Sequence, residues 1–302
     1  MVSLTHVYDI NRELTDTKET IVRSLGKLKE FWQEYKRSRA AVFGLAIVLA
    51  FILIAILAPL LTTYSPWSMA GEPFEPPSFN HVMGTDDLGR DILSQVVYGS
   101  RLSLMVGSLA AGTSTVIGIL VGTVAGYFGG LVDDFLMRVT EAFQVIPRFF
   151  LAMVMVAIFG GNILNLILVI GILSWPTISR VVRAEFLSLK EREFVEAVRI
   201  LRVRSSHIIF KEILPNALPP VIVSASLEVA GAILLEAGLS FLGLGDPNLI
   251  SWGYMLNNAQ RFIRHGWWLT VFPGIGISSL SLGLALIGDG LNYSLNPKLK
   301  RR

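Results

Sequence analysis

The chain contains no cysteine and few charged residues. Without cysteine it cannot form a disulfide framework, a zinc finger or a thiol nucleophile. Charged residues make up 16% of the 302 residues, whereas hydrophobic residues make up 52% and the mean hydropathy is +0.58. These values lie outside the usual range of soluble globular proteins. We therefore expect an all-α integral membrane protein.

The sequence also lacks the common catalytic motifs. It has no G-x-x-x-x-G-K-[ST] phosphate-binding loop and no H-E-x-x-H zinc motif, and its four histidines are scattered. The string Gly243-Leu244-Gly245-Asp246 matches the G-x-G-D of intramembrane aspartyl proteases. Such a protease needs a second aspartate in a facing span, and no apolar run contains one. We therefore expect no catalytic site, metal or cofactor in this chain.

Long apolar runs predict six transmembrane helices. Residues 40–64 and 102–132 carry no charge, and at 1.5 Å per residue each run can cross a hydrocarbon core of roughly 30 Å. The other predicted spans are residues 135–159, 163–182, 217–244 and 267–287. In the second span, glycines at short spacing provide a small face that lets helix backbones approach closely. Pro176 predicts a kink in the fourth span.

Positive charge predicts the orientation in the membrane. Residues 1–39 hold eight Lys and Arg side chains, residues 180–211 hold another eight and residues 298–302 hold four, whereas the segments 65–101 and 245–266 hold two each. Basic residues stay on the cytoplasmic side. We therefore expect the segments 1–39, 183–216 and 288–302 in the cytoplasm, and 65–101 and 245–266 outside. Residues 18–39 also show the spacing of an amphipathic helix at a membrane surface.

The cytoplasmic segment between the fourth and fifth spans is predicted to form two short amphipathic helices. In the first, Phe194, Val198 and Leu201 share one face. In the second, Ser205 or Ser206 is expected to cap the helix and Pro215 to end it. The second apolar face consists of Ile208, Ile209, Ile213 and Leu214. Such a helix pair must rest against lipid headgroups, its own bundle or another protein.

Charged residues also occur within the predicted spans. Carboxylates in a bilayer usually mark a cavity or a partner. Glu228 and Glu236 in the fifth span therefore either face a translocation path or form an ion pair or hydrogen bond with another helix. The structural role is favoured for Glu236, and both roles stay open for Glu228. Arg138, Glu141 and Arg148 in the third span are expected to snorkel or to be paired.

Several short motifs occur one after another along the chain. They are Gly84-Thr85-Asp86-Asp87-Leu88-Gly89-Arg90-Asp91, Glu196-Ala197-Val198 followed by Leu214-Pro215-Asn216, Leu239-Ser240-Phe241-Leu242-Gly243-Leu244-Gly245, Ser251-Trp252-Gly253 and Gly288-Asp289-Gly290-Leu291. Together they resemble the inner permeases of binding-protein-dependent ABC importers of the dipeptide, oligopeptide and nickel type. Within that family the pattern is similar to the second of the two paired permeases.

The resemblance implies a type I ABC importer fold and a set of partners. The partners are a second, homologous permease, two ATPase subunits that use ATP and Mg, an extracytoplasmic substrate-binding protein and a bacterial or archaeal cytoplasmic membrane, with no nucleic acid. The segment 183–216 would be the EAA loop, which couples ATPase closure to the pore. The coupling residues implied are Glu196, Ala197, Val198, Arg199, Leu201, Arg202, Ser205, Leu214, Pro215 and Asn216. Glu196 is expected to make a charge-assisted contact with the ATPase.

The sequence departs from this family at two coupling positions. Arg202 stands where glycine is usual, so a turn with positive φ would cost roughly 1 kcal/mol there. Val198 replaces an alanine and adds bulk to the docked face.

The loop of residues 81–101 allows three interpretations. It could contact the binding protein, seal the outer mouth, or lie along the membrane surface, which we favour. Asp86, Asp87 and Asp91 suggest metal ligands, but Arg90 among them indicates local ion pairing instead.

Two alternatives concern the substrate and the class of protein. The same machinery could import nickel, glycosides or another solute rather than di- or oligopeptides. A self-contained secondary transporter would need midplane ion sites and usually an internal repeat, which the sequence does not show.

Overall fold

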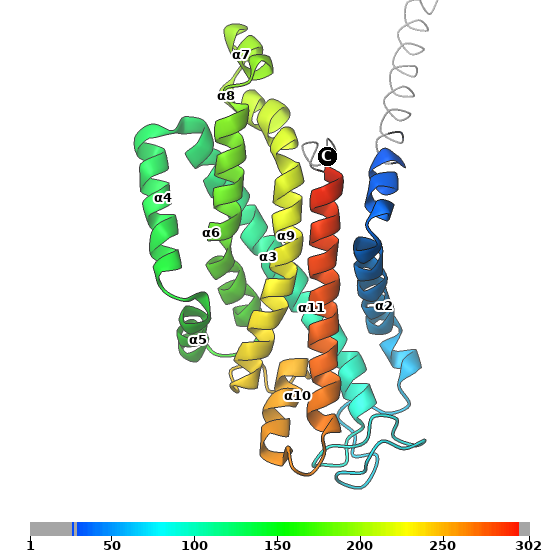
Figure 1. Ribbon diagram of the computed structural model, residues 1–302. Coiled ribbons are helices and arrows are strands. Elements are labelled where there is room, and N and C mark those ends of the chain that lie inside the picture. Colours follow the sequence, from blue (N-terminus) through cyan, green and yellow to red (C-terminus); the bar gives the residue numbers. More distant parts are fainter. Residues whose placement is uncertain (1–25, 27–28, 296–302) are drawn as a thin grey trace, which may run out of the picture.

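The protein is a bundle of long helices in a computed structural model that describes residue 26 and residues 29–295 (Figure 1). The long helices are α2 (Arg39–Leu61), α3 (Ile92–Phe128), α4 (Gly130–Val145), α5 (Arg148–Phe159), α6 (Ile163–Leu189), α9 (Leu214–Phe241) and α11 (Trp268–Leu295). Short elements connect them: α7 (Glu193–Ile200), α8 (Ser205–His207), the π-helix η1 (Ile208–Ile213), α10 (Trp252–Ala259) and the 3-10 helix η2 (Gln260–Phe262). The described residues thus form an all-helical fold.

Five helices are long and apolar enough to cross a membrane: α2, α3, α6, the continuous run Ser205–Phe241 and α11. The bent pair α4 and α5 makes a sixth if it is counted as one span. Most of the predicted amphipathic helix at 18–39 lies outside the described residues, although residues 29–37 are helical. Ser38 then caps α2, because its side chain accepts a hydrogen bond from the backbone N–H of Ala41 at 3.2 Å.

The second long helix begins ten residues earlier than the predicted span 102–132, so residues 92–101 are helix rather than loop. Asp91 starts α3 by accepting a hydrogen bond from the backbone N–H of Ser94 at 2.8 Å. Arg101 is accommodated because its guanidinium donates to the carbonyls of Ala55 and Ile56 in α2. Pro59 has no N–H to offer Ala55, so Arg101 supplies the missing donor.

The predicted third span, 135–159, is not one helix. The chain bends by 84° between α4 and α5. Pro147 explains the break, because proline lacks an N–H and disfavours helical backbone at the preceding residue. Ile146 accordingly adopts an extended conformation, with φ −88° and ψ 128°. Pro176, by contrast, lies within the continuous helix α6.

Three other segments are more helical than the sequence indicated. Helix α6 continues seven residues beyond position 182, and α11 continues through Leu295 rather than ending at 287. The segment 245–266 contains α10 and η2. Pro215 does not end a helix but lies in the first turn of α9, directly after the π-helix η1. The chain is therefore helical without interruption from Ser205 to Phe241.

The predicted small face of the second span packs α3 against α6. A Cβ placed on Gly118 would lie 2.7 Å from the side chain of Ile178, and one on Gly126 would lie 2.5 Å from Phe186. A Cβ on Gly122 would lie 2.5 Å from a carbonyl oxygen of α6. These glycines, four residues apart, therefore bring the two helix backbones into direct contact.

Candidate functional site

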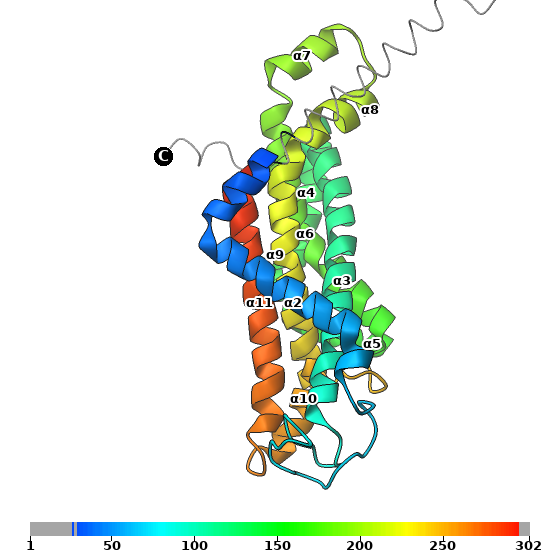
Figure 2. The same cartoon turned by 90° about the vertical axis from the view of Figure 1, so that its right-hand side faces the viewer.

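Helices α7 and α8 extend beyond the long helices at one end of the bundle (Figure 2). The N-terminal part of α2 and the C-terminal part of α11 lie at this same end, whereas α10 lies at the opposite end (Figure 1). We refer to these as the α7 end and the α10 end. The coupling residues implied by the resemblance lie at the α7 end.

A compact apolar cluster attaches α7 and η1 to the bundle. Val195 of α7 and Ile213 of η1 are fully buried and belong to one cluster with Phe186 and Val182 of α6. The nearby end of α6 is held by two further contacts. Lys190 donates to the carbonyl of Gly126 at 3.0 Å, and Arg183 pairs with Asp133 of α4. The position of α7 relative to α6 is therefore fixed by packing rather than by a free loop.

The opposite face of α7 and the turn after it are uncovered and apolar. Leu201 and Ile200 are each 75% exposed, and Phe194 is 40% exposed. Within the predicted face Phe194, Val198 and Leu201, only Val198 packs partly on the cluster. The buried anchor is instead Val195, which leaves the predicted stripe available to another molecule.

The remaining coupling residues divide between exposed positions and the start of α9. Glu196, Ala197 and Arg199 are exposed on α7. Leu214 is partly buried and packs on the cluster. Asn216 is exposed and donates to the carbonyl of Glu212 at 2.6 Å.

The turn between α7 and α8 is strained at Arg202. Its φ is +53°, in the left-handed region that favours glycine. The turn does require a positive φ, so Arg202 adopts this conformation at the expected cost in conformational energy. The predicted serine cap of α8 is wrong, because Ser205 is the first helical residue and the N-cap residue, Arg204, makes no side-chain cap.

An ion pair joins two charged residues deep in the bundle. Arg148, the first residue of α5, donates to Glu228 of α9 at 2.6 Å and to the hydroxyl of Ser174 of α6 at 3.0 Å. The side chain of Arg148 is 34% exposed and that of Glu228 is 10% exposed. The sequence analysis considered Arg148 and Glu228 separately, because their positions in the chain differ by 80.

Glu236 lies inside the bundle. It is 1% exposed and accepts a hydrogen bond from Ser240 at 2.6 Å. These contacts favour the structural role weighed for it, because the carboxylate does not reach the surface of this subunit. On α4, Arg138 and Glu141 are both exposed and lie 3.7 Å apart.

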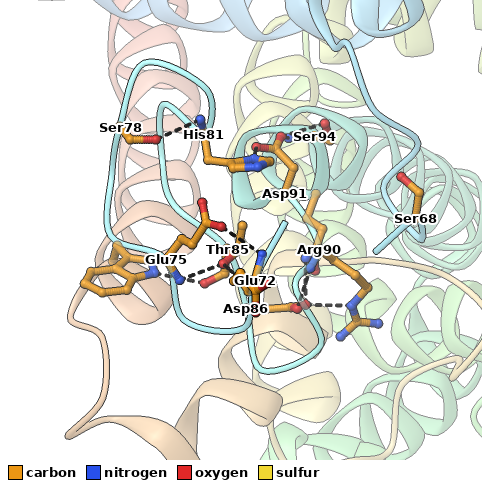
Figure 3. A network of polar contacts seen from close by, with 12 residues as sticks. Ser68, Glu72, Glu75, Ser78, His81, Thr85, Asp86, Arg90, Asp91 and Ser94 are labelled. Atoms are coloured by element: carbon orange, nitrogen blue, oxygen red, sulfur yellow. Dashed lines mark hydrogen bonds and ion pairs between the residues drawn. The ribbon is translucent and has the colours of Figure 1, made fainter. Parts of the chain in front are cut away.

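At the α10 end, the loop before α3 forms a buried polar network (Figure 3). Asp86 accepts from Arg90 at 2.6 Å and from Gln95 at 2.9 Å. Asp91 accepts from Ser94 and lies 3.0 Å from the ring of His81. The expected ion pairing of Arg90 is confirmed, and the expected position of the loop along the membrane surface stays a prediction. His81, Asp86, Arg90 and Asp91 are all at most 6% exposed.

Electrostatics act in opposite directions on two residues of the loop, favouring the charged form of Arg90 and disfavouring that of Asp87. Burial by itself would lower the pKa of the Arg90 guanidinium, but the adjacent Asp86 carboxylate outweighs burial and raises that pKa. Partial burial and the negative charge of Asp86 raise the pKa of Asp87. In the described part of the chain, no group of three or more His, Asp or Glu side chains could hold a metal ion. Trp268 of α11 donates to the carbonyl of Thr85 at 3.0 Å and ties the loop to the bundle.

Comparison with known proteins shows the family to which the chain belongs. Residues 118–301 match the family described as the inner membrane component of binding-protein-dependent transport systems. Residues 26–77 match the N-terminal transmembrane domain of oligopeptide transport permease C. The chain belongs to this permease family. It is therefore a multi-pass membrane component of a binding-protein-dependent ABC transport system.

Relatives over most of the length carry peptide-transport names. The chain is 41% identical to the dipeptide transport system permease protein DppC of Alkalihalophilus pseudofirmus, over 90% of each chain. It is 37% identical to the di/tripeptide transport system permease protein DppC of Pseudomonas aeruginosa, over 90% of this chain and 93% of the relative. It is 34% identical to the oligopeptide transport system permease protein OppC of Bacillus subtilis, over 95% and 94%.

A solved structure confirms the fold. The MetNI methionine ABC transporter, in an inward-facing conformation, contains a chain that aligns with a TM-score of 0.55 at 19% identity. The alignment covers 68% of this permease and 98% of that chain. The permease thus has the fold of a type I ABC importer subunit, as the sequence predicted.

Proposed function

We propose that this permease forms half of the translocation pore of an ATP-driven importer for di- or oligopeptides. A second, homologous permease forms the other half, and two ATPase subunits bind at the α7 end. An extracytoplasmic binding protein delivers the substrate to the α10 end. The names of the relatives support the peptide class. Import of nickel, glycosides or another solute by the same machinery is the alternative.

The observation that carries the proposal is the uncovered apolar face of α7. Leu201 and Ile200 are three-quarters exposed at the end of the bundle that holds the end of α6 and α7, which belong to the basic segment 180–211. Basic segments remain cytoplasmic, which supports docking of an ATPase that uses cytoplasmic ATP and Mg on this face. The proposed membrane is the cytoplasmic membrane of a bacterium or archaeon, with both termini inside.

In the proposed coupling step, Glu196 makes a charge-assisted contact with a basic group of the ATPase. The exposed side chains of α7 fill the docking groove around that contact. ATPase closure then displaces α7, and the displacement reaches the pore through α6 and α9, which flank the segment on either side.

The experiment is reconstitution of the complex in vesicles. The permease is co-expressed with its genomic neighbours, purified in mild detergent and tested for ATP-dependent uptake of labelled dipeptide in the presence of the binding protein. We expect co-purification of two ATPase subunits and a second permease. A protein that purifies alone and moves solute under an ion gradient, without ATP, would contradict the proposal. Screening ligands on the binding protein identifies the solute.

A further inference from the structure

The ion pair between Arg148 and Glu228 lies at a depth where charge is costly. Glu228 is near the midpoint of α9 (Leu214–Phe241), and Ser174, the other partner of Arg148, is near the midpoint of α6 (Ile163–Leu189). Both helices are membrane spans. The pair therefore lies well inside the hydrocarbon layer, far from either headgroup region.

The pair is nevertheless open on one side of the subunit. One third of the Arg148 side chain is exposed, although its partners Glu228 and Ser174 are almost covered. Ionised side chains in transmembrane segments face a bundle interior or a water-filled cavity rather than lipid. The surface beside Arg148 must therefore border water or another protein subunit.

The bend between α4 and α5 and a glycine of α9 create this opening. The 84° bend at Pro147 turns α5 away from the axis of α4 and brings Arg148, the next residue, to the side of α9. On α9, Gly231 leaves room for the guanidinium, because a Cβ there would lie 3.3 Å from the Nη2 atom of Arg148. The guanidinium of Arg148 is thus directed toward the carboxylate of Glu228 at a place that the subunit does not cover completely.

We propose that Arg148 and Glu228 form a charge gate on the translocation path, which opens by exchanging its own ion pair for the two charged ends of a peptide. The inference rests on the proposed function. Glu228 receives the substrate ammonium and Arg148 receives the substrate carboxylate, while Ser174 keeps its hydrogen bond to the guanidinium. The exchange involves no covalent step and leaves the net charge of the site unchanged.

Selectivity follows from the need to satisfy both charges. Separating the pair leaves two unpaired ions in a region of low dielectric, which is strongly unfavourable. A zwitterionic peptide compensates both ions at once. A solute with a single charge leaves one ion unpaired, and a neutral solute leaves both. The gate therefore favours peptides with free termini, independently of the binding protein.

The first test is whether water reaches the pair. Because the chain has no native cysteine, single cysteines report their own surroundings. Gly231→Cys places a thiol beside Arg148, and Ala232→Cys, the next residue and fully buried, is the matched control. Both variants are studied in the assembled complex with a charged, membrane-impermeant thiosulfonate reagent, and labelling of this chain is read by mass spectrometry.

We expect Gly231→Cys to react at least 10-fold faster than Ala232→Cys, and dipeptide with binding protein to slow the reaction. Equal rates for the two variants would place the pair away from water and overturn the gate. Because labelling is measured in assembled complexes, that failure would leave the importer itself intact. Failure of the proposed function would appear earlier, as absence of the complex or of ATP-driven uptake.

The second test is uptake by Glu228→Gln, which keeps the shape of the side chain but removes its charge. We expect dipeptide uptake to fall at least 10-fold in complexes that assemble in normal yield. Arg138→Gln is the control, because it removes one partner of the exposed pair on α4 and should leave uptake unchanged. Unchanged uptake by Glu228→Gln would overturn the proposal, as would an equal loss in Arg138→Gln.

Discussion

The two ends of the helix bundle differ in where their charged side chains lie. At the α10 end, charged residues such as Asp86 and Arg90 are buried and satisfied within the subunit. At the α7 end, apolar residues such as Ile200 and Leu201 are left exposed. Apolar side chains are exposed at the α10 end too, among them Phe79 and Ile263, so the feature that distinguishes this end is its buried and paired charge. Exposed leucine and isoleucine side chains are typical of a surface that binds a partner.

Backbone strain occurs at both ends. Arg202 at the α7 end has φ +53° although a glycine would adopt this conformation freely. At the α10 end the corresponding turns in the loop before α3 use Gly84 and Gly89, with φ of +80° and +73°. Phe74 in the same loop nevertheless has φ +60°, so each end holds one non-glycine residue in the left-handed region, and at the α7 end that residue lies beside the exposed face.

The largest effect is expected from a substitution at the α7 end. Glu196→Lys should leave insertion intact and reduce substrate-stimulated ATP hydrolysis to the unstimulated rate, because it replaces an attractive contact with the ATPase by a repulsive one. The measurement is ATPase activity of the assembled complex. Glu191→Lys, the same change at an exposed residue before α7, is the control. Normal stimulation in Glu196→Lys would remove Glu196 from the coupling contact.

At the α10 end the expected effect is on stability. Asp86→Ala leaves Arg90 buried without its carboxylate, which should cost about 3–5 kcal/mol of unfolding free energy. The neighbouring Asp87→Ala is the control, because Asp87 is 27% exposed and lies 4.0 Å from Arg90. Thermal unfolding of the purified permease in detergent should separate the two variants. Equal melting temperatures would show that the network is not stabilised by this pair.

A third pair of variants compares a buried with an exposed apolar side chain at the α7 end. Ile213→Ala removes a fully buried side chain and should destabilise the permease by about 2–5 kcal/mol. Leu201→Ser should leave the melting temperature unchanged but weaken association with the ATPase about 10-fold, or about 1.4 kcal/mol. Quantitative co-purification measures the second effect. Destabilisation by Leu201→Ser would mean that this face packs within the subunit after all.

The smallest effect tests the strained turn. Arg202→Gly relieves a left-handed conformation and should raise the unfolding free energy by about 1 kcal/mol at most, since glycine also increases the entropy of the unfolded chain. Arg202→Val should lower it, because a β-branched residue tolerates positive φ poorly. Both changes are followed by thermal unfolding. A reversed order would show that contacts of the arginine outweigh its backbone strain.

The sequence was sufficient for features that depend on local composition. Charge-free runs such as 40–64 predicted membrane helices, and the short glycine spacing around Gly118 predicted a close helix contact. The ion pair of Arg90 was also predictable, because its partner is only four residues away. In each case the decisive information lies within a few turns of helix.

Features that depend on distant segments were missed or misjudged. The pairing of Arg148 with Glu228 requires that α5 lie beside α9, which no local pattern encodes. The burial of the loop around Asp86 depends on Trp268, far along the chain. The break at Pro147 did have a local signal, but the apolar composition of 135–159 outweighed it. Pro215 was wrongly predicted to end a helix, because proline is also common in the first turn of a helix, which is where Pro215 lies.

The glycine contact between α3 and α6 has a consequence for motion. Backbones that touch at Gly118, Gly122 and Gly126 leave no side-chain layer that could shear, so the two helices move as one rigid body. The changes of chain direction lie outside this pair. Gly129 and Gly130, both with positive φ, connect it to α4, and the bend at Pro147 connects α4 to α5. In the proposed mechanism, a displacement of α7 would therefore act on Arg148 through α6, whose Ser174 accepts a hydrogen bond from its guanidinium, while the corners at 129–130 and 147 would let α4 and α5 follow.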